Sequence, residues 1–465
     1  MPFALLLCAA LCANFILAGG HDIQRLTELG VFVLGSGLML AQCHDLIRTS
    51  FGSPAGKAVA LFFLLGAIGS VFAFSTAYAA FEVASLLMLY LLAVMAGRDI
   101  ARLGTGALPP ILRCIGVACA FQMLPFTVRY GASLAFGNAI DESDLATGFS
   151  NIRFFNHVQT ATLPLLVLLC HIEPRKRLRW LWLAVAACWW MLLVATTGRG
   201  TLLGLAAACA AVVILLRGAA WPYLKTAAST AALGLLAYFV LLVALPAVAG
   251  IDGLSAFSYA AQRTAADPAS GRLVLWGRAV ELVARHPLLG VGPMHFAHGK
   301  GEPSQAAHPH DWLLQIGSEW GLPALACLVG ALALGMRALL EARQHIAHAD
   351  GTGRTIHAAM VAGAVAILVD GLVSGLFVMP ASRIAIALYL GCALGWYRAV
   401  VPAAPSTPGR RERVAGAVLV ALALAGTAAI WPEALARYRG EPLTAAQQAA
   451  NPGVHWPRLW EAGFF

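Results

Sequence analysis

Apolar runs of about 20 residues recur along this chain of 465 residues, and short polar or basic segments separate them. Because an α-helix needs about 20 apolar residues to cross a bilayer, the pattern predicts about thirteen membrane-spanning helices. Their approximate bounds are 3–19, 29–45, 58–74, 77–96, 110–128, 158–171, 180–197, 201–216, 226–248, 310–336, 356–378, 383–397 and 415–431. The first run has no basic segment ahead of it, so we expect a retained helix rather than a cleaved signal peptide.

Composition supports this interpretation: an all-α, polytopic integral membrane protein with about 12–13 transmembrane helices. Hydrophobic residues make up 60% of the chain and charged residues 11%, a balance far from that of soluble domains. The net charge of +9 would suit nucleic acid, but the positive-inside bias of membrane proteins explains most of it. We therefore expect membrane lipids, and no nucleic acid, as partners. All ten cysteines lie in or beside apolar runs, which predicts neither a zinc site nor a disulfide in the large loops.

Basic residues set the expected orientation. If the N-terminus starts in the cytoplasm, the even-numbered connections lie inside, and they carry more than half of the lysines and arginines. The larger outside pieces would then face the periplasm, which predicts a multi-pass protein of a bacterial inner membrane. The expected division is N-terminal transmembrane helices at 1–128, a periplasmic loop at 129–157, transmembrane helices at 158–248, a large periplasmic loop with an amphipathic helix at 249–309, C-terminal transmembrane helices at 310–431 and a periplasmic tail at 432–465.

Several arginines on the expected outer side are not explained by this bias. Arg153 lies in the first large loop, Arg199 lies in the short turn "TTGRGTLLG", and Arg272 and Arg278 begin the amphipathic helix. Guanidinium groups bind phosphate oxygens bidentately, so Arg199 and Arg272 are candidates to hold the diphosphate of a lipid. The alternatives are an arginine that snorkels at a helix end and an interfacial helix anchored on the lipid headgroups.

The stretch "AAHPHDWLLQIGSEWG" at 306–321 gathers titratable groups where an apolar run begins. Pro309 disfavours helix at His308, so we expect the helix to start at or just after it, with Asp311 in the first turn. Histidine is the natural group to take a proton from an alcohol near neutral pH. His310 is therefore the candidate catalytic residue and His308 its neighbour. Simple helix capping and a metal site are the other interpretations.

Metal binding is the weaker interpretation. Two histidines are an incomplete ligand set, and His295 and His298, which we expect to be solvated, lie beyond a Gly/Pro-rich turn. No metal and no other cofactor is therefore expected. Asp370 lies within a predicted span, where a carboxylate is costly and usually has a partner. It either orients an arginine or histidine of the site or forms a buried salt bridge, with Arg383 or a site arginine as partner.

Ordered motifs in the second half resemble a known family. They are the Gly-Arg-Gly turn, "GRLVLWGRAVELVARHPLLGVGPMHF", "HPHDWLLQIGSEWGLPAL" and "DGLVSGLFVMPASR", within roughly 195–385, and "GFSNIRFFNHVQT" at 148–160 lies ahead of them. The chain resembles the O-antigen ligase and polymerase superfamily of bacterial membrane glycosyltransferases. The resemblance implies a GT-C-like fold and metal-independent transfer of a glycan from undecaprenyl diphosphate to an acceptor hydroxyl at the periplasmic face.

The resemblance also implies roles for single residues. The diphosphate-binding arginines of the family correspond to Arg199 and Arg272, its essential histidine to His310, and its intramembrane acidic residue to Asp370. The family commonly has Asn after this histidine, whereas this chain has Asp311, which would orient His310 or raise its pKa. We expect lipid A-core as the acceptor. A protein O-oligosaccharyltransferase and an O-antigen polymerase are the alternatives, and a lipid-glycan flippase is the alternative of another class.

Overall fold

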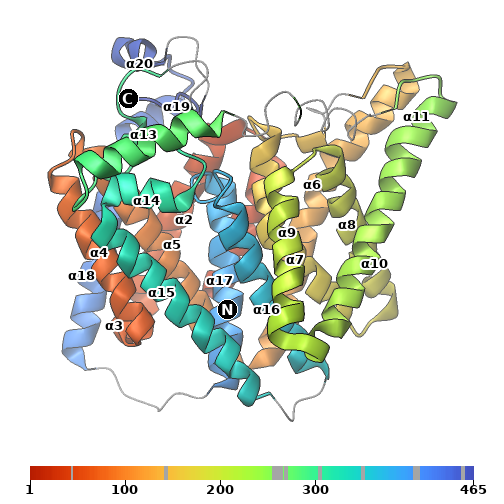
Figure 1. The fold of residues 1–465 in the computed structure, drawn as a ribbon, viewed down its shortest axis with the longest axis horizontal. Coiled ribbons are helices and arrows are strands. Elements are labelled where there is room, and N and C mark those ends of the chain that lie inside the picture. The colour runs from red at the N-terminus through yellow and green to blue at the C-terminus, as the bar shows by residue number, and fades with distance from the viewer. Residues whose placement is uncertain are drawn as a thin grey trace.

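The computed structural model describes residues 1–42, 45–140, 145–253, 265, 271–301, 306–346, 351–401, 409–451 and 456–465, and over these residues it is built from helices (Figure 1). Most helices stand side by side, and α13, α14, α19 and α20 cover one end of the bundle. The bounds of the α-helices are α1 (Pro2–Leu17), α2 (Gly20–Gln42), α3 (Leu46–Phe51), α4 (Pro54–Val71), α5 (Thr76–Leu103), α6 (Leu108–Phe136), α7 (Ile152–Ile172), α8 (Lys176–Ala195), α9 (Arg199–Leu216), α10 (Trp221–Ala237), α11 (Leu245–Val248), α13 (Arg272–Arg285), α14 (Trp312–Trp320), α15 (Leu322–Glu341), α16 (Gly351–Asp370), α17 (Pro380–Val400), α18 (Arg410–Ala428), α19 (Trp431–Tyr438) and α20 (Ala445–Ala450).

The prediction of a multi-pass, all-helical membrane protein is confirmed, with a smaller number of spans. Among the described residues, nine helices are long and apolar enough to cross a membrane, or ten if α18 and α19, bent by 53°, form one span. The prediction of 12–13 is higher for three reasons. The stretch Arg199–Val248 counts as one long segment although it contains α9 and α10, and α1 has only 16 residues. In addition, α17, at the predicted span 383–397, is not among the nine helices.

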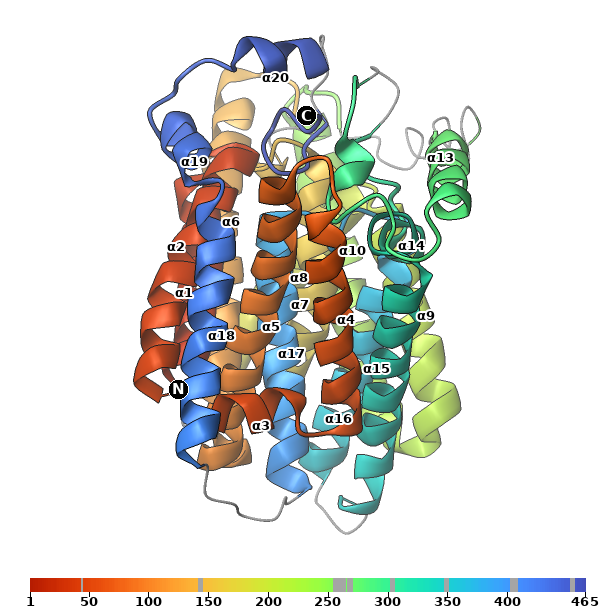
Figure 2. The same cartoon turned by 90° about the vertical axis from the view of Figure 1, so that its left-hand side faces the viewer.

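Polar residues inside the bundle are tolerated because the central helices are shielded from lipid by their neighbours. α5 packs along α17, and α16 packs against both α7 and α9 (Figure 2). In α7, almost every residue from Phe154 to Cys170 is buried, including Asn156, His157 and Gln159. Since polar groups in a membrane interior need protein partners, this packing allows α7 to carry buried polar side chains next to α9 and α16.

One predicted span, 310–336, is wrong as a single helix. The structure divides it at Gly321, which has a φ of +86°, into α14 and α15. A Cβ at this position would lie 2.3 Å from the carbonyl oxygen of Leu288, so the loop after α13 passes directly against the break. The amide of Leu322 donates to the carbonyl of Pro287 at 2.8 Å. α14 therefore lies across the end of the bundle, at an angle to α15 (Figure 2).

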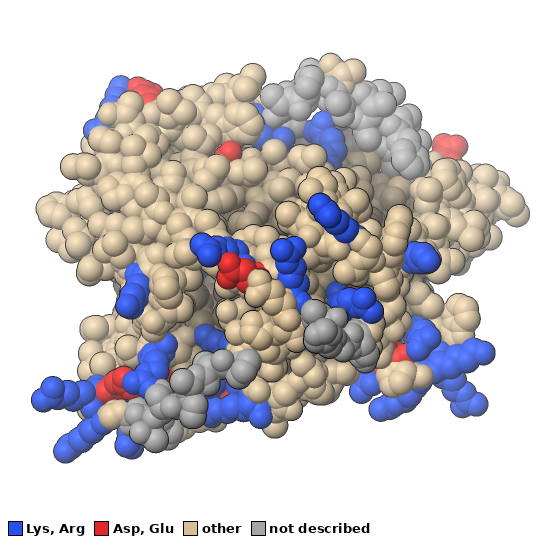
Figure 3. All heavy atoms as spheres, turned by 60° about the horizontal axis from the view of Figure 1, so that its bottom comes forward, with Lys and Arg blue, Asp and Glu red and all other residues tan. Residues whose placement is uncertain are grey.

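Basic side chains gather at the opposite end of the molecule. Figure 3 brings the lower end of Figure 1 forward and shows many lysines and arginines over this face. The cluster Arg175, Lys176, Arg177 and Arg179 lies at the start of α8. This segregation agrees with the predicted positive-inside pattern. The two ends of the bundle thus differ in charge and in their covering elements.

Candidate active site

A cavity of about 180 Å³ lies at the end of the bundle that α13 and α14 cover. The starts of α7, α9 and α13, the end of α16 and the loop before α14 surround it. The cavity is lined by Asn151, Arg153, Phe154, Asn156, His157, Gly198, Arg199, Gly200, Thr201, Arg272, Leu275, Ala306, His308, His310, Asp370, Val373, Ser374, Trp456 and Pro457. Six of the eight residues singled out from the sequence are therefore brought together from segments far apart in the chain, and Arg278 and Asp311 are not in this lining.

The Gly-Arg-Gly turn brings α9 close to two neighbouring helices. A Cβ at Gly200 would lie 2.5 Å from Oδ1 of Asp370, and a Cβ at Gly198 would lie 2.9 Å from Oδ1 of Asn156. The carbonyl of Thr197, a residue with a φ of +50°, accepts a hydrogen bond from the guanidinium of Arg153 at 2.8 Å. The two glycines are needed because side chains at these positions would push α9 away from α7 and α16.

Three helices begin at the cavity, each with an arginine in its first turn. Arg153 follows the N-cap Asn151 of α7, and Arg199 and Arg272 are the first residues of α9 and α13. A helix N-terminus carries partial positive charge and unpaired amide donors. Three N-termini and three guanidinium groups around one cavity make it strongly favourable for a multiply charged anion.

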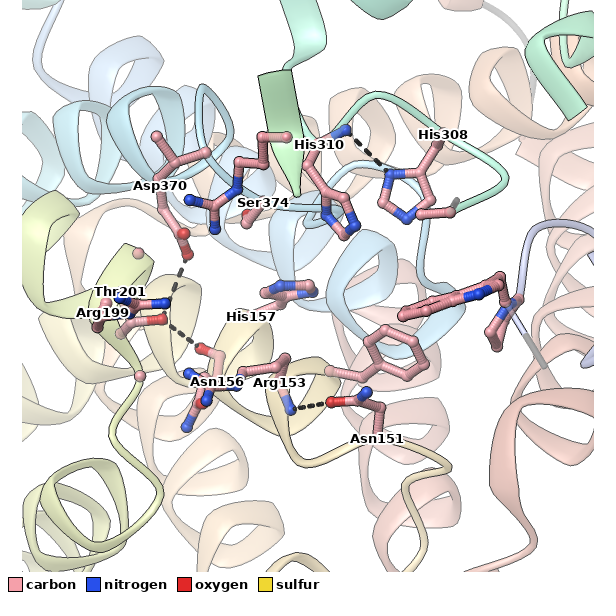
Figure 4. Close-up of a pocket in the computed structure, with 18 of the residues that line it drawn as sticks. Asn151, Arg153, Asn156, His157, Arg199, Thr201, His308, His310, Asp370 and Ser374 are labelled. Carbon is pink, nitrogen blue, oxygen red and sulfur yellow. Dashed lines mark hydrogen bonds between the residues drawn. The ribbon is translucent and has the colours of Figure 1, made fainter. Parts of the chain in front are cut away.

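The His-Pro-His loop is held from several sides. The main-chain amide of His310 donates to Nδ1 of the buried His308 at 3.3 Å, and the two rings lie 4.1 Å apart (Figure 4). Nε1 of Trp276 in α13 donates to the carbonyl of Pro309 at 3.1 Å. A Cβ on Gly375 would lie only 2.4 Å from the His308 ring, so the backbone at Gly375 passes directly against this ring. His308 is thus a buried support that fixes the backbone of His310.

His310 has an uncommon backbone conformation. Its φ of +55° lies in the left-handed region, which costs free energy for a residue with a Cβ. Burial and, second, the positive charge of Arg272 lower the pKa of His310 to about 3. Burial, followed by the charge of His310, also lowers the pKa of His308. Both rings are therefore neutral near pH 7, and the neutral imidazole of His310 is able to accept a proton.

Asp311 is the N-cap of α14. Its Oδ1 accepts hydrogen bonds from the amides of Leu313 at 2.8 Å and Leu314 at 3.0 Å. Burial raises its pKa, and these two hydrogen bonds oppose the shift. Among the hydrogen bonds of the described residues, none joins its carboxylate to His310. Asn and Asp are about equally good N-caps, so an Asn at position 311 would serve the same local structure.

Asp370 ends α16 in the cavity wall and is fully buried. Oδ2 accepts hydrogen bonds from the hydroxyls of Thr160 at 2.5 Å and Thr201 at 3.3 Å. Arg383, predicted as one possible partner, is instead paired with Glu28 at 3.3 Å and with Glu82. Asp370 thus connects α16 to α7 and α9 beside the arginines of the cavity.

Arg278 has a supporting position outside the cavity. Its guanidinium lies 4.6 Å from the ring centre of Phe296 and donates to the carbonyl of His298 at 3.2 Å. The prediction that His295 is solvated is wrong, because His295 is buried and accepts a hydrogen bond from the amide of Ser75 at 2.9 Å. His298 is half-buried and stacks on Phe74. These contacts fix α13 above the bundle.

The remaining lining residues were not singled out from the sequence, among them His157, Trp456 and Pro457. His157 lies in the middle of the labelled group in Figure 4, and its only sequence signal is its place in the motif "GFSNIRFFNHVQT". Trp456 and Pro457 come from the segment predicted as a periplasmic tail. Nothing in the hydrophobic pattern indicates that this segment returns to the cavity.

Within the described ranges, no group of three or more His, Cys, Asp or Glu side chains is placed to hold a metal ion. Metal-independent chemistry stays a prediction that requires its own test.

The fold and the cavity define a multi-pass membrane protein with an arginine- and histidine-lined pocket at one end. Residues 181–329 match the family model described as Wzy_C, O-antigen ligase, so this segment carries an O-antigen ligase domain. Among curated proteins, none matches the chain. Such a domain implies glycan transfer of the O-antigen ligase or polymerase type from lipid-linked substrates. The matched region contains Arg199, Arg272 and His310, whereas α7, α16 and Trp456 complete the cavity from outside it.

Proposed function

We propose that this enzyme transfers an O-antigen glycan from undecaprenyl diphosphate to a hydroxyl of lipid A-core at the periplasmic face of the inner membrane. The observation that carries the proposal is the convergence of Arg153, Arg199 and Arg272 with three helix N-termini around His310. A diphosphate is the anion that such a site would stabilise most, both in the bound donor and as the departing group.

The reaction requires two kinds of help. The oxygen of the acceptor hydroxyl bonds to the anomeric carbon while the bond between that carbon and the phosphate oxygen breaks. Undecaprenyl diphosphate departs with the electron pair of that bond, and the arginines stabilise its growing negative charge. The imidazole of His310 takes the hydroxyl proton or positions the acceptor for attack. Asp370 and the two threonines hold α9 and α16 in register around this centre.

The distribution of charge supports the proposed periplasmic orientation. The cavity lies at the end opposite the basic face of Figure 3, and the positive-inside rule assigns that basic face to the cytoplasm. The charges of the cavity gather at one end of the bundle instead of following a path through it, which favours a transferase over a flippase.

Transfer by the purified protein tests the proposal. With an undecaprenyl-diphosphate-linked glycan and lipid A-core in detergent, His310→Ala should lower the transfer rate about 10²–10⁴-fold. His345→Ala, an exposed histidine beyond α15, serves as the control and should keep the wild-type rate. An unchanged rate in His310→Ala would remove the catalytic assignment. Arg199→Lys keeps the charge but removes the guanidinium fork, so donor affinity should fall; wild-type affinity would contradict bidentate binding.

The competing functions give different outcomes. Rates that are insensitive to EDTA are expected, and loss of activity with EDTA would support a metal site. Transfer in detergent, where no membrane separates two compartments, contradicts a flippase. Deletion of the gene should remove glycan from lipopolysaccharide. Loss of glycan from a periplasmic protein instead would identify a protein O-oligosaccharyltransferase. A glycan that is shortened but still attached would identify a polymerase.

A further inference from the structure

Residues 456–465, here called the strap, fold back from α20 onto the cavity end of the bundle. Trp456 and Pro457 line the cavity, and Arg458, Leu459 and Trp460 are no more than 3% exposed. Gly463 allows the strap to fold tightly on itself, because a Cβ there would lie 1.7 Å from the carbonyl oxygen of Trp456. The strap is therefore a packed element of the site.

Buried ion pairs fix the start of the strap. The guanidinium of Arg458 lies 2.7 Å from the carboxylate of Glu319 in α14 and 3.5 Å from that of Glu82 in α5. The guanidinium of Arg25 in α2 donates to the carbonyl of Leu459 at 3.1 Å. These contacts attach the strap to three helices within two or three residues of Trp456.

Main-chain hydrogen bonds fix its end. The amide of Phe465 donates to the carbonyl of Ala297 at 3.1 Å, and the amide of Gly299 donates to the main-chain oxygen of Phe465 at 2.8 Å. Asn451 makes a reciprocal pair of hydrogen bonds with the backbone of Phe464 at 2.9 and 2.8 Å. With both ends held, the position of Trp456 is set by the rest of the fold.

The cavity has two chemically different sides. Arg199, Thr201 and Asp370 lie together on one side of His157 and His310 (Figure 4). Leu275 and Ala306 form an apolar cluster against which Trp456 packs, and all three line the cavity. A ligand that fits both sides must carry an anionic group directly beside a group with an apolar face.

We propose that Trp456, with Pro457 and Leu275, forms a subsite for the sugar ring bonded to the donor diphosphate. This inference rests on the proposed function, because it takes the diphosphate to lie among the arginines. A pyranose presents an apolar face of C–H groups that packs on an aromatic side chain, while its hydroxyls remain free for polar partners. The cavity of about 180 Å³ suits this first ring and leaves the rest of the glycan outside.

Two lipids separate sugar binding from diphosphate binding. The probes are undecaprenyl diphosphate and the same lipid carrying one N-acetylhexosamine, each titrated onto the purified full-length protein. Trp456→Ala should weaken binding of the sugar-bearing lipid about tenfold and leave the affinity for the sugar-free lipid unchanged. Trp456→Phe, which keeps an aromatic face, should restore most of the lost affinity. Trp431→Ala, a tryptophan 41% exposed on α19, should bind both lipids as the wild type does.

The outcomes are distinct. If Trp456→Ala and Trp456→Phe weaken binding of both lipids equally, Trp456 has a purely structural role and the subsite is overturned. Unchanged binding of the sugar-bearing lipid by Trp456→Ala would also overturn the subsite. Thermal unfolding of each variant shows whether the strap is still folded, and the Phe variant tests the proposal if the Ala variant unfolds. A wild-type protein that binds neither lipid would instead refute the proposed function itself.

Discussion

At the scale of a single residue, the protonation of His310 depends on its surroundings. Burial and the charge of Arg272 lower its pKa to about 3, so the ring of the free enzyme loses its proton far below neutral pH. We therefore expect kcat/KM to be flat between about pH 5 and 8 with respect to this group, since this ratio reports the free enzyme. The negative charge of a bound diphosphate offsets the positive charge of Arg272 and raises the pKa of His310. We therefore expect kcat, which reports the substrate-bound enzyme, to fall at acidic pH.

Measurement of both profiles for the wild type checks this expectation. A fall of kcat/KM below about pH 6.5 that is absent in His310→Ala would contradict it. Such a result would mean that the free enzyme holds His310 in an ordinary, solvated environment.

Asp311 gives a second test at the same scale. Because its carboxylate caps α14 through the amides of Leu313 and Leu314, Asp311→Asn should keep both the stability and the transfer rate. Asp311→Ala should cost about 1 kcal/mol of unfolding free energy. Thermal unfolding in detergent, with transfer assayed in parallel, separates the two variants. If Asp311→Asn lowered kcat while remaining fully folded, the negative charge itself would act on His310.

At the scale of the element, the site depends on how closely α9 approaches α16. Gly200→Ala would place a Cβ 2.5 Å from Oδ1 of Asp370, a group already held by Thr160 and Thr201. We expect this variant to lose about 1–3 kcal/mol of stability and to transfer glycan at least about tenfold more slowly, because Arg199 and Asp370 are displaced. Gly218→Ala, with open space around its Cβ, is the matched control and should match the wild type in unfolding and transfer. A wild-type rate in Gly200→Ala would contradict the close packing.

The sequence predicts elements well where local pattern decides them. Apolar runs locate the upright helices, and the motifs identify six residues that line the cavity. The break at Gly321 is different, because it depends on contact with Leu288, a residue distant in sequence and invisible to hydropathy. The N-cap position of Asp311 depends on the exact start of α14 at Trp312, which a hydrophobic pattern locates only to within a few residues.

At the scale of the whole molecule, the cavity depends on charges that the sequence leaves scattered. A connected cluster of ionised groups, none more than 3% exposed, joins α2, α5, α14, α17 and the strap. Its members are Arg25, Glu28, Glu82, Glu319, Arg383 and Arg458. Glu82, Glu319 and Arg383 lie in predicted apolar runs, Arg25 and Glu28 lie in the connection between two runs, and Arg458 lies in the predicted tail. Only the folded structure therefore reveals the pairing. This is why Trp456 escaped prediction: its position depends on Arg458.

Removal of one charge from this cluster tests its importance. Arg458→Met leaves the carboxylate of Glu319 buried without its closest partner, so we expect a loss of about 3–5 kcal/mol and slower transfer as the strap loosens. Burial already raises the pKa of Glu319, and Arg458 opposes that shift. A carboxyl group with a raised folded pKa favours folding below its unfolded pKa and loses this contribution as pH rises. The unfolding deficit of Arg458→Met should therefore shrink as the pH is lowered.

The added change Glu319→Gln should recover part of the loss at neutral pH. Arg439→Met, at an exposed pair with Glu441, should leave thermal unfolding unchanged, and an equal effect of the two arginine variants would contradict a buried cluster that holds the strap.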